Sequence, residues 1–201
     1  AVVNMFGAGL LESLYMTIVS FAIAYVIGLP LGVLLVVTDS KGIKPIPWLN
    51  RLVGIVVNIF RSIPFIILLV MVIPLTRAIV GTTLGSTATI VPLIISAAPF
   101  IARVVESSLK EVDPGVIEAA QSMGASPMKI VFSVLIPEAK SSLIVGAAIA
   151  ITTILGYSAM AGFVGGGGLG TIAVNYGYYR YQTDVMLIAV ALLVVIVQVL
   201  Q

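Results

Sequence analysis

The sequence predicts an all-α membrane protein whose helices cross a lipid bilayer several times. Of its 201 residues, 60% are hydrophobic and 9% are charged, and the mean hydropathy is +1.23. A soluble domain carries roughly a quarter of charged residues, because its surface faces water. This chain must therefore face lipid over much of its surface. No segment alternates polar and apolar residues as the strands of a membrane β-barrel do.

Five segments are apolar over a length that suits a membrane span, for which a helix needs about 20 residues. We expect spans over about residues 14–37, 62–76, 87–105, 143–163 and 185–200, within a single domain of residues 1–201. An alternative start for the second span is Leu52, where apolar sequence begins. We recognise no cleavable signal pattern ahead of the first span.

Basic residues gather in two alternate loops. The loops after the first and third spans contain Lys41, Lys44, Arg51, Lys110, Lys129 and Lys140. The other loops carry Arg77 and Arg180. By the positive-inside rule, the two basic loops are cytoplasmic. An odd number of spans then places the N-terminus outside and the C-terminus in the cytoplasm.

The residues that usually perform catalysis are missing or lack the required context. The chain has no Cys and no His, which excludes thiol nucleophiles, imidazole bases and the usual zinc ligands. Gly165, Gly167 and Gly170 match the dinucleotide pattern GxGxxG, but they follow a membrane span instead of a β-strand. We interpret them as a flexible turn outside the membrane or a plain loop. We expect no catalytic residue, cofactor or metal, and no phosphate-binding P-loop for ATP.

The cytoplasmic segment 106–142 carries the clearest helix signals outside the spans. Asp113-Pro114 is an N-cap followed by proline at the first helical position, and Gly124 suits the left-handed residue that ends the helix. Ser126-Pro127 starts a second helix, which Pro137 interrupts. The sequence therefore predicts two short helices at an angle.

Each short helix has an apolar face at helical spacing. These faces consist of Val116, Ala119, Ala120 and Met123 in the first helix, and of Ile130, Val131, Val134 and Leu135 in the second. An exposed amphipathic helix can enter a groove of a partner protein or lie on the lipid interface. The physical pattern leaves both interpretations open.

A resemblance to a known family separates the two. Glu118-Ala119-Ala120, then three residues, Gly124, nine residues, and Val134-Leu135-Ile136-Pro137 resemble the EAA loop of binding-protein-dependent ABC importer permeases. The resemblance implies a coupling helix that sits in a cleft of a cytoplasmic ATP-binding subunit. The coupling residues would be Glu118, Ala119, Ala120, Gly124, Ser126, Pro127 and Pro137.

Two further segments resemble the methionine-type permeases of that family. They are Arg61-Ser62-Ile63-Pro64-Phe65, and Ala159-Met160-Ala161-Gly162 running into residues 165–170. The resemblance implies a homodimer in the bacterial inner membrane, two ATPase subunits and an external lipoprotein that delivers methionine. A permease for another polar amino acid or an osmoprotectant, a passive channel and a membrane-embedded enzyme are the alternatives.

Small residues in the spans are the remaining candidates. Gly156, Ser158, Ala159 and Met160 could line a translocation path, because they lie one turn inside the outer surface, or could simply pack against other helices. Gly28 and Gly32 have the GxxxG spacing of helix dimers, although Pro30 lies between them. Tyrosines around Arg180 suggest an interfacial aromatic belt or, alternatively, a ligand-stacking site.

Overall fold

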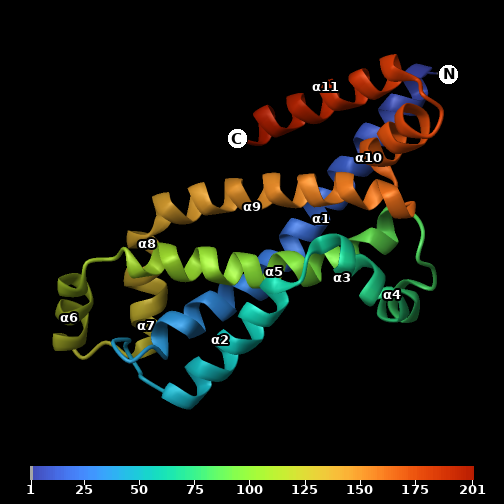
Figure 1. Cartoon of the computed structure of the whole chain (residues 1–201). Coiled ribbons are helices and arrows are strands. Elements are labelled where there is room, and N and C mark those ends of the chain that lie inside the picture. The colour runs from blue at the N-terminus through green and yellow to red at the C-terminus, as the bar shows by residue number, and fades with distance from the viewer. Residues whose placement is uncertain (1) are drawn as a thin grey trace. The chain divides into compact units, whose positions relative to one another are not determined.

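The computed structural model describes the backbone of residues 2–201 and the side chains of residues 3–201, so Ala1 lies outside the described residues. Within this range every regular element is a helix (Figure 1). In chain order they are α1 (Val2–Val37), α2 (Pro47–Ser62), α3 (Phe65–Met71), α4 (Ile73–Val80), α5 (Ser86–Lys110), α6 (Pro114–Ser122), α7 (Pro127–Ile130), the π-helix η1 (Val131–Leu135), α8 (Ile136–Glu138), α9 (Lys140–Met160), the 3₁₀-helix η2 (Ala161–Val164), α10 (Gly168–Ile172), the π-helix η3 (Ala173–Tyr178) and α11 (Thr183–Leu200).

Several of these helices are long and apolar enough to cross a membrane. Four stretches meet this condition, Val3–Val37, Ser86–Lys110, Lys140–Tyr178 and Thr183–Leu200, and the bent pair α2 and α3 makes a fifth if it is counted as one span. The predicted fold class, an all-α polytopic membrane protein, is confirmed. Helix α1 has 36 residues. At 1.5 Å per residue it is about 54 Å long, well above the roughly 30 Å of a hydrocarbon core.

The expected second span, residues 62–76, does not form one continuous helix. It covers α3 and the first half of α4, which meet at Val72, and α2 ends just before it at Ser62. Pro64 lies in the break between α2 and α3, where it precedes α3 as its N-cap. Proline has no backbone N–H to donate to a preceding turn, so a helix cannot continue undisturbed through it.

The chain forms two compact units. The first comprises residues 1–23, 63–97 and 149–201. Its core contains Phe6, Leu155, Leu169, Ile172, Ala189 and Ile196, all buried. This cluster packs the beginning of α1 together with α9, α10 and α11. Phe65 and Tyr157 stack at 4.7 Å between ring centroids and join α3 to α9.

The second unit comprises residues 24–62 and 98–148. Here α1 packs on α5 through two glycines. A Cβ atom on Gly28 would lie 2.7 Å from Cγ2 of Ile101, and one on Gly32 would lie 2.7 Å from the carbonyl oxygen of Ala102. Small residues let membrane helices approach this closely. The GxxxG spacing therefore serves contact between helices of the same chain.

Candidate functional site

The first short helix of the segment 106–142 begins and ends where the sequence predicted. Pro114 is the first residue of α6, and the Asp113 carboxylate accepts a hydrogen bond of 2.9 Å from the Gly115 N–H. After the helix, Gly124 has a φ of +79°, a left-handed conformation that favours glycine. The Ala125 N–H then donates to the Ala120 carbonyl at 3.2 Å, as in a typical helix C-cap.

The second short helix is also confirmed, and its apolar face packs inside the second unit. The Ser126 hydroxyl accepts a hydrogen bond from the Lys129 N–H at 3.3 Å, and Pro127 is the first residue of α7. Ile130, Val131 and Leu135 are buried. The α-helix gives way to the π-helix η1 at Val131, before Pro137, and Pro137 itself lies inside the three-residue α8, so the chain stays helical up to Glu138.

Helix α6, in contrast, is uncovered on its predicted partner face. None of its residues is buried, and Glu118, Ala119 and Gly124 are exposed, while Ala120 is half-buried. Met123 is 87% exposed, and Met128 and Phe132 are exposed nearby in sequence. Ser126, Pro127 and Pro137 are also exposed, so all predicted coupling residues except Ala120 lie open on the surface.

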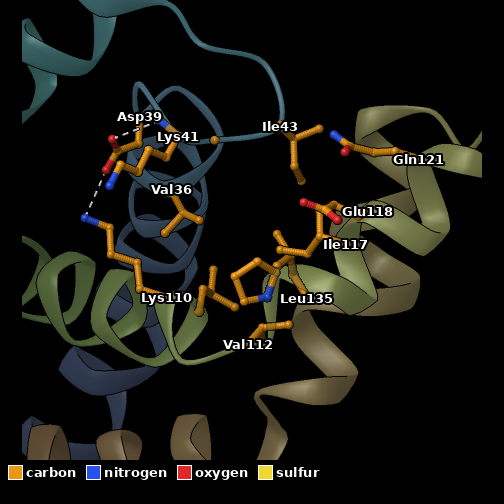
Figure 2. A pocket seen from close by; sticks show the side chains of 13 residues that line it. Val36, Asp39, Lys41, Ile43, Lys110, Val112, Ile117, Glu118, Gln121 and Leu135 are labelled. Atoms are coloured by element: carbon orange, nitrogen blue, oxygen red, sulfur yellow. Dashed lines mark hydrogen bonds and ion pairs between the residues drawn. The ribbon is translucent and has the colours of Figure 1, made fainter.

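A cavity of about 450 Å³ lies beside α6 (Figure 2). Its charged and amide side chains are Asp39, Lys41, Lys110, Glu118 and Gln121. Figure 2 shows the Asp39 and Lys110 side chains on one side of the cavity and Glu118 and Gln121, from α6, on the other. The cavity therefore separates α6 from the ends of α1 and α5.

A chain of ionic contacts fixes the end of α5 behind this cavity. Lys110 Nζ lies 3.1 Å from an Asp39 carboxylate oxygen and 3.5 Å from Glu106. Glu106 also pairs with Arg103 at 3.0 Å. The Arg103 guanidinium then donates to Asn58 Oδ1 at 2.9 Å and to the Gly54 carbonyl at 3.3 Å. These contacts connect α5 with α2 and with the end of α1. Helix α6 therefore follows a helix end that ion pairs and hydrogen bonds hold in place.

The Asp39–Lys110 pair gives stability that depends on pH. The hydrogen bond from Lys110 is the largest cause that lowers the pKa of Asp39 below its ordinary value of 3.8. A lowered pKa stabilises the folded state above the ordinary value, and this stability is lost as the pH falls through the lower folded-state pKa. We expect Asp39→Asn to lower the free energy of unfolding by about 0.5–1 kcal/mol at pH 7, as for a partly exposed pair.

The measurement is denaturant unfolding of the detergent-solubilised protein, wild type against Asp39→Asn, as a function of pH. The difference between the two should close as the pH falls below 3.8, because the wild-type carboxyl group then becomes neutral. A difference that persists unchanged at low pH would assign the effect to packing and not to charge.

The four candidate path residues lie on different sides of α9. Gly156 and Met160 are exposed and share one face, four residues apart. Ser158 is buried, and its hydroxyl donates to the Leu155 carbonyl at 2.6 Å. Ala159 is half-buried, and its backbone lies against Gly170. The structure thus brings Gly156 and Met160 together and turns Ser158 toward the interior.

Two residues near the start of α1 were missed by the sequence analysis. The Glu12 carboxylate accepts a hydrogen bond of 2.8 Å from the Gly168 N–H, and the Ser13 hydroxyl accepts one of 2.9 Å from the Leu169 N–H. The glycine-rich segment 165–168, interpreted as a flexible turn or a plain loop, is therefore a loop tied to another helix. The available signal was an acidic residue just before a long apolar stretch.

The tyrosine cluster after α10 is an aromatic group in space as well as in sequence. The Arg180 guanidinium carbon lies 4.6 Å from the centre of the Tyr176 ring. Tyr178 and Tyr179 meet edge to face at 5.2 Å between centroids. Such rings suit a membrane interface, where one end is apolar and the other is hydrated.

Comparison with known proteins places these features in context. The model of the family described as "Binding-protein-dependent transport system inner membrane component" matches residues 28–201. A probable D-methionine transport system permease protein MetI from Vibrio cholerae is 50% identical over 190 residues, which cover 94% of this chain and 84% of that protein. The D-methionine transport system permease protein MetI of Escherichia coli K12 is 56% identical over 154 residues, which cover 77% of this chain and 71% of that protein.

Solved structures give the same result. A chain from inward-facing conformations of the MetNI methionine ABC transporter superposes with a TM-score of 0.97 at 53% identity, covering 99% of this chain and 92% of that chain. A chain of an amino acid ABC transporter superposes with a TM-score of 0.79 over 98% of this chain and 90% of that chain. Its identity is 22%, so this second likeness concerns the fold alone.

Proposed function

Because the chain belongs to the family of binding-protein-dependent transport system inner membrane components, we propose that it forms the path by which methionine enters the cell. It is a multi-pass inner-membrane permease subunit of an ABC importer. The substrate proposal is supported by relatives 50% and 56% identical that are named for D-methionine transport. The likeness to the methionine transporter structure supports it further.

The single observation that carries the coupling proposal is the uncovered face of α6. Glu118, Ala119 and Gly124 are exposed, although α6 has defined caps at both ends. A rigid short helix with a small-residue face suits insertion into a groove of a partner protein. The partner proposed for this face is the cytoplasmic ATP-binding subunit. A second copy of the chain and an external substrate-binding lipoprotein complete the proposed assembly.

In the proposed mechanism, ATP binding draws together the coupling helices of two permease copies. Because α6 is attached to the braced ends of α1 and α5, its displacement is passed to the spans. The path then opens outward to receive methionine, and hydrolysis reverses the motion. This is a shift between two states, each favoured by different nucleotide and substrate contacts. The exposed face of Gly156 and Met160 is the proposed wall of the path.

The first test is the composition of the purified complex. The permease is co-expressed with the ATP-binding protein encoded beside it, extracted in detergent and weighed by native mass spectrometry. We expect two copies of each subunit. Scrambling residues 118–122, which leaves Asp113, Met123 and Gly124 in place, should remove the ATPase subunits but leave a permease that elutes as a single species, because α6 contributes no buried residue to its unit.

Two further outcomes decide against parts of the proposal. A wild-type permease that purifies without an ATPase would favour the passive channel. Uptake into proteoliposomes that carry the full complex, measured with methionine, a polar amino acid and an osmoprotectant, then tests the substrate. Equal or faster uptake of either competitor would contradict the methionine assignment.

A further inference from the structure

The loop of residues 165–168 has a backbone shape that depends on α1. Gly165, Gly167 and Gly168 have φ values of +74°, +82° and +77°. Moreover, a Cβ atom on Gly167 would lie 2.6 Å from the Glu12 carboxylate, and one on Gly168 would lie 2.6 Å from the Ser13 hydroxyl. Side chains of α1 therefore occupy the space beside the loop that a larger residue would need.

The same two side chains accept hydrogen bonds from consecutive backbone N–H groups, those of Gly168 and Leu169, at 2.8 and 2.9 Å. These groups begin α10 and have no acceptor within that helix. The bond to the ionised carboxylate is charge-assisted and therefore stronger than a neutral one. Glu12 is exposed, whereas Ser13 is 1% exposed.

The opposite side of the loop is tied to α5. The Gly85 N–H donates to the Gly165 carbonyl at 2.9 Å, just before α5 begins. The Thr89 hydroxyl donates to the Gly166 carbonyl at 3.0 Å. Four hydrogen bonds thus join residues 165–169 to α1 and to the residues at the start of α5, all within the first compact unit.

We propose that Glu12 and Ser13 are positioning residues that lock this glycine loop to α1, so that the first turns of α1 and the turn between α9 and α10 move as one body during transport. A segment with three left-handed glycines has many alternative conformations of similar energy. Its shape must therefore be set by the groups that hold it. The prediction for transport rests on the proposed function, whereas the prediction for the loop does not.

The test is hydrogen–deuterium exchange of the peptide covering residues 165–172 in the purified complex with its ATPase subunits. Glu12→Ala should accelerate exchange of the Gly168 amide, which donates to Glu12, at least about tenfold, the expected effect of losing a hydrogen bond to a charged group. Glu12→Gln keeps an acceptor oxygen and should restore most of the protection. Leu11→Ala, a neighbour on α1 that is 68% exposed, is the matched control and should leave exchange unchanged.

The second readout is the number of methionine molecules taken up per ATP hydrolysed in proteoliposomes. This ratio should fall in Glu12→Ala and recover in Glu12→Gln.

In the wild type, protection of the two amides should be equal without nucleotide and with a bound ATP analogue. Unchanged exchange in Glu12→Ala would overturn the tether. Faster exchange with bound nucleotide, or an unchanged uptake ratio in Glu12→Ala, would overturn the positioning role. Failure of the wild type to take up methionine would contradict the proposed function and leave the exchange result standing.

Discussion

Replacing Gly170 by valine should strongly destabilise the folded permease. A Cβ atom at this position would overlap the carbonyl oxygen and Cα of Ala159, and one on Gly162 would overlap the carbonyl group of Gly170. Both obstacles are backbone atoms, which no change of side-chain rotamer can move. Overpacking that forces the backbone apart costs about 3 kcal/mol or more. This is a large part of the stability of a typical domain, about 5–15 kcal/mol.

The measurement is the yield and the thermal unfolding midpoint of the detergent-purified protein. Gly7→Ala is the matched control, because a Cβ atom there meets nothing within 4 Å. In a helix interior this change should be neutral or should stabilise by about 0.5–1 kcal/mol. A Gly170→Val protein with the wild-type midpoint would show that the turn between α9 and α10 can widen at little cost.

Replacing Gly124 by aspartate should uncouple ATP hydrolysis from transport. A Cβ atom on Gly124 meets nothing within 4 Å in this chain, so the isolated permease has room for the new side chain. The left-handed φ of +79° costs about 1–2 kcal/mol for a residue with a Cβ, and aspartate adopts it more readily than most. The chain should therefore fold, while the added bulk and charge stand where the ATPase subunit is proposed to approach.

The measurement is methionine uptake and ATP hydrolysis by the same proteoliposomes, with the expectation that hydrolysis continues and uptake is lost. Gly81→Asp provides the matched control. Gly81 has a φ of +88°, follows α4 as its C-cap, and likewise has no atom within 4 Å of a Cβ. It carries the same backbone cost in the other compact unit. Wild-type coupling in Gly124→Asp, or equal uncoupling in both variants, would contradict the role of α6 as the coupling helix.

Local signals made the helices of the loop 106–142 predictable from the sequence. Asp113 and Ser126 each cap a helix that begins with proline, and Gly124 ends one, so three positions set the boundaries of two helices. The two N-cap hydrogen bonds connect residues that are two and three apart in the chain. The buried face of Ile130 and Leu135 follows from helical periodicity. The all-α membrane fold follows from composition in the same way.

The tether of the glycine loop could not be predicted, because its partners are 156 residues apart in the chain. The acidic residue before the apolar stretch draws attention to Glu12, but nothing local identifies its partner. Glu12 stands before the apolar stretch that hydropathy detects, in a part of α1 that extends past the expected span of residues 14–37. Hydropathy detects the part of a helix that lies in the hydrocarbon core, and not the residues at which the helix begins or ends. The glycine pattern of residues 165–170 was interpreted as a flexible turn or a plain loop. Glycines indicate which backbone conformations are allowed, but they do not indicate which groups fix the backbone in one of them.

The glycine contacts between α1, α5 and α9 also constrain how related sequences can differ. At Gly146 the obstacle to a Cβ atom is a methyl group of Val104, with the Ser108 hydroxyl farther off at 3.9 Å. A larger residue at 146 can therefore be accommodated by a smaller one at 104, and the two positions should covary among relatives. At Gly32 the nearest atoms include the Ala102 carbonyl oxygen, at 2.7 Å, which every amino acid possesses. We therefore expect glycine at position 32 even in relatives in which the side chains at positions 104 and 146 differ in size from those in this chain.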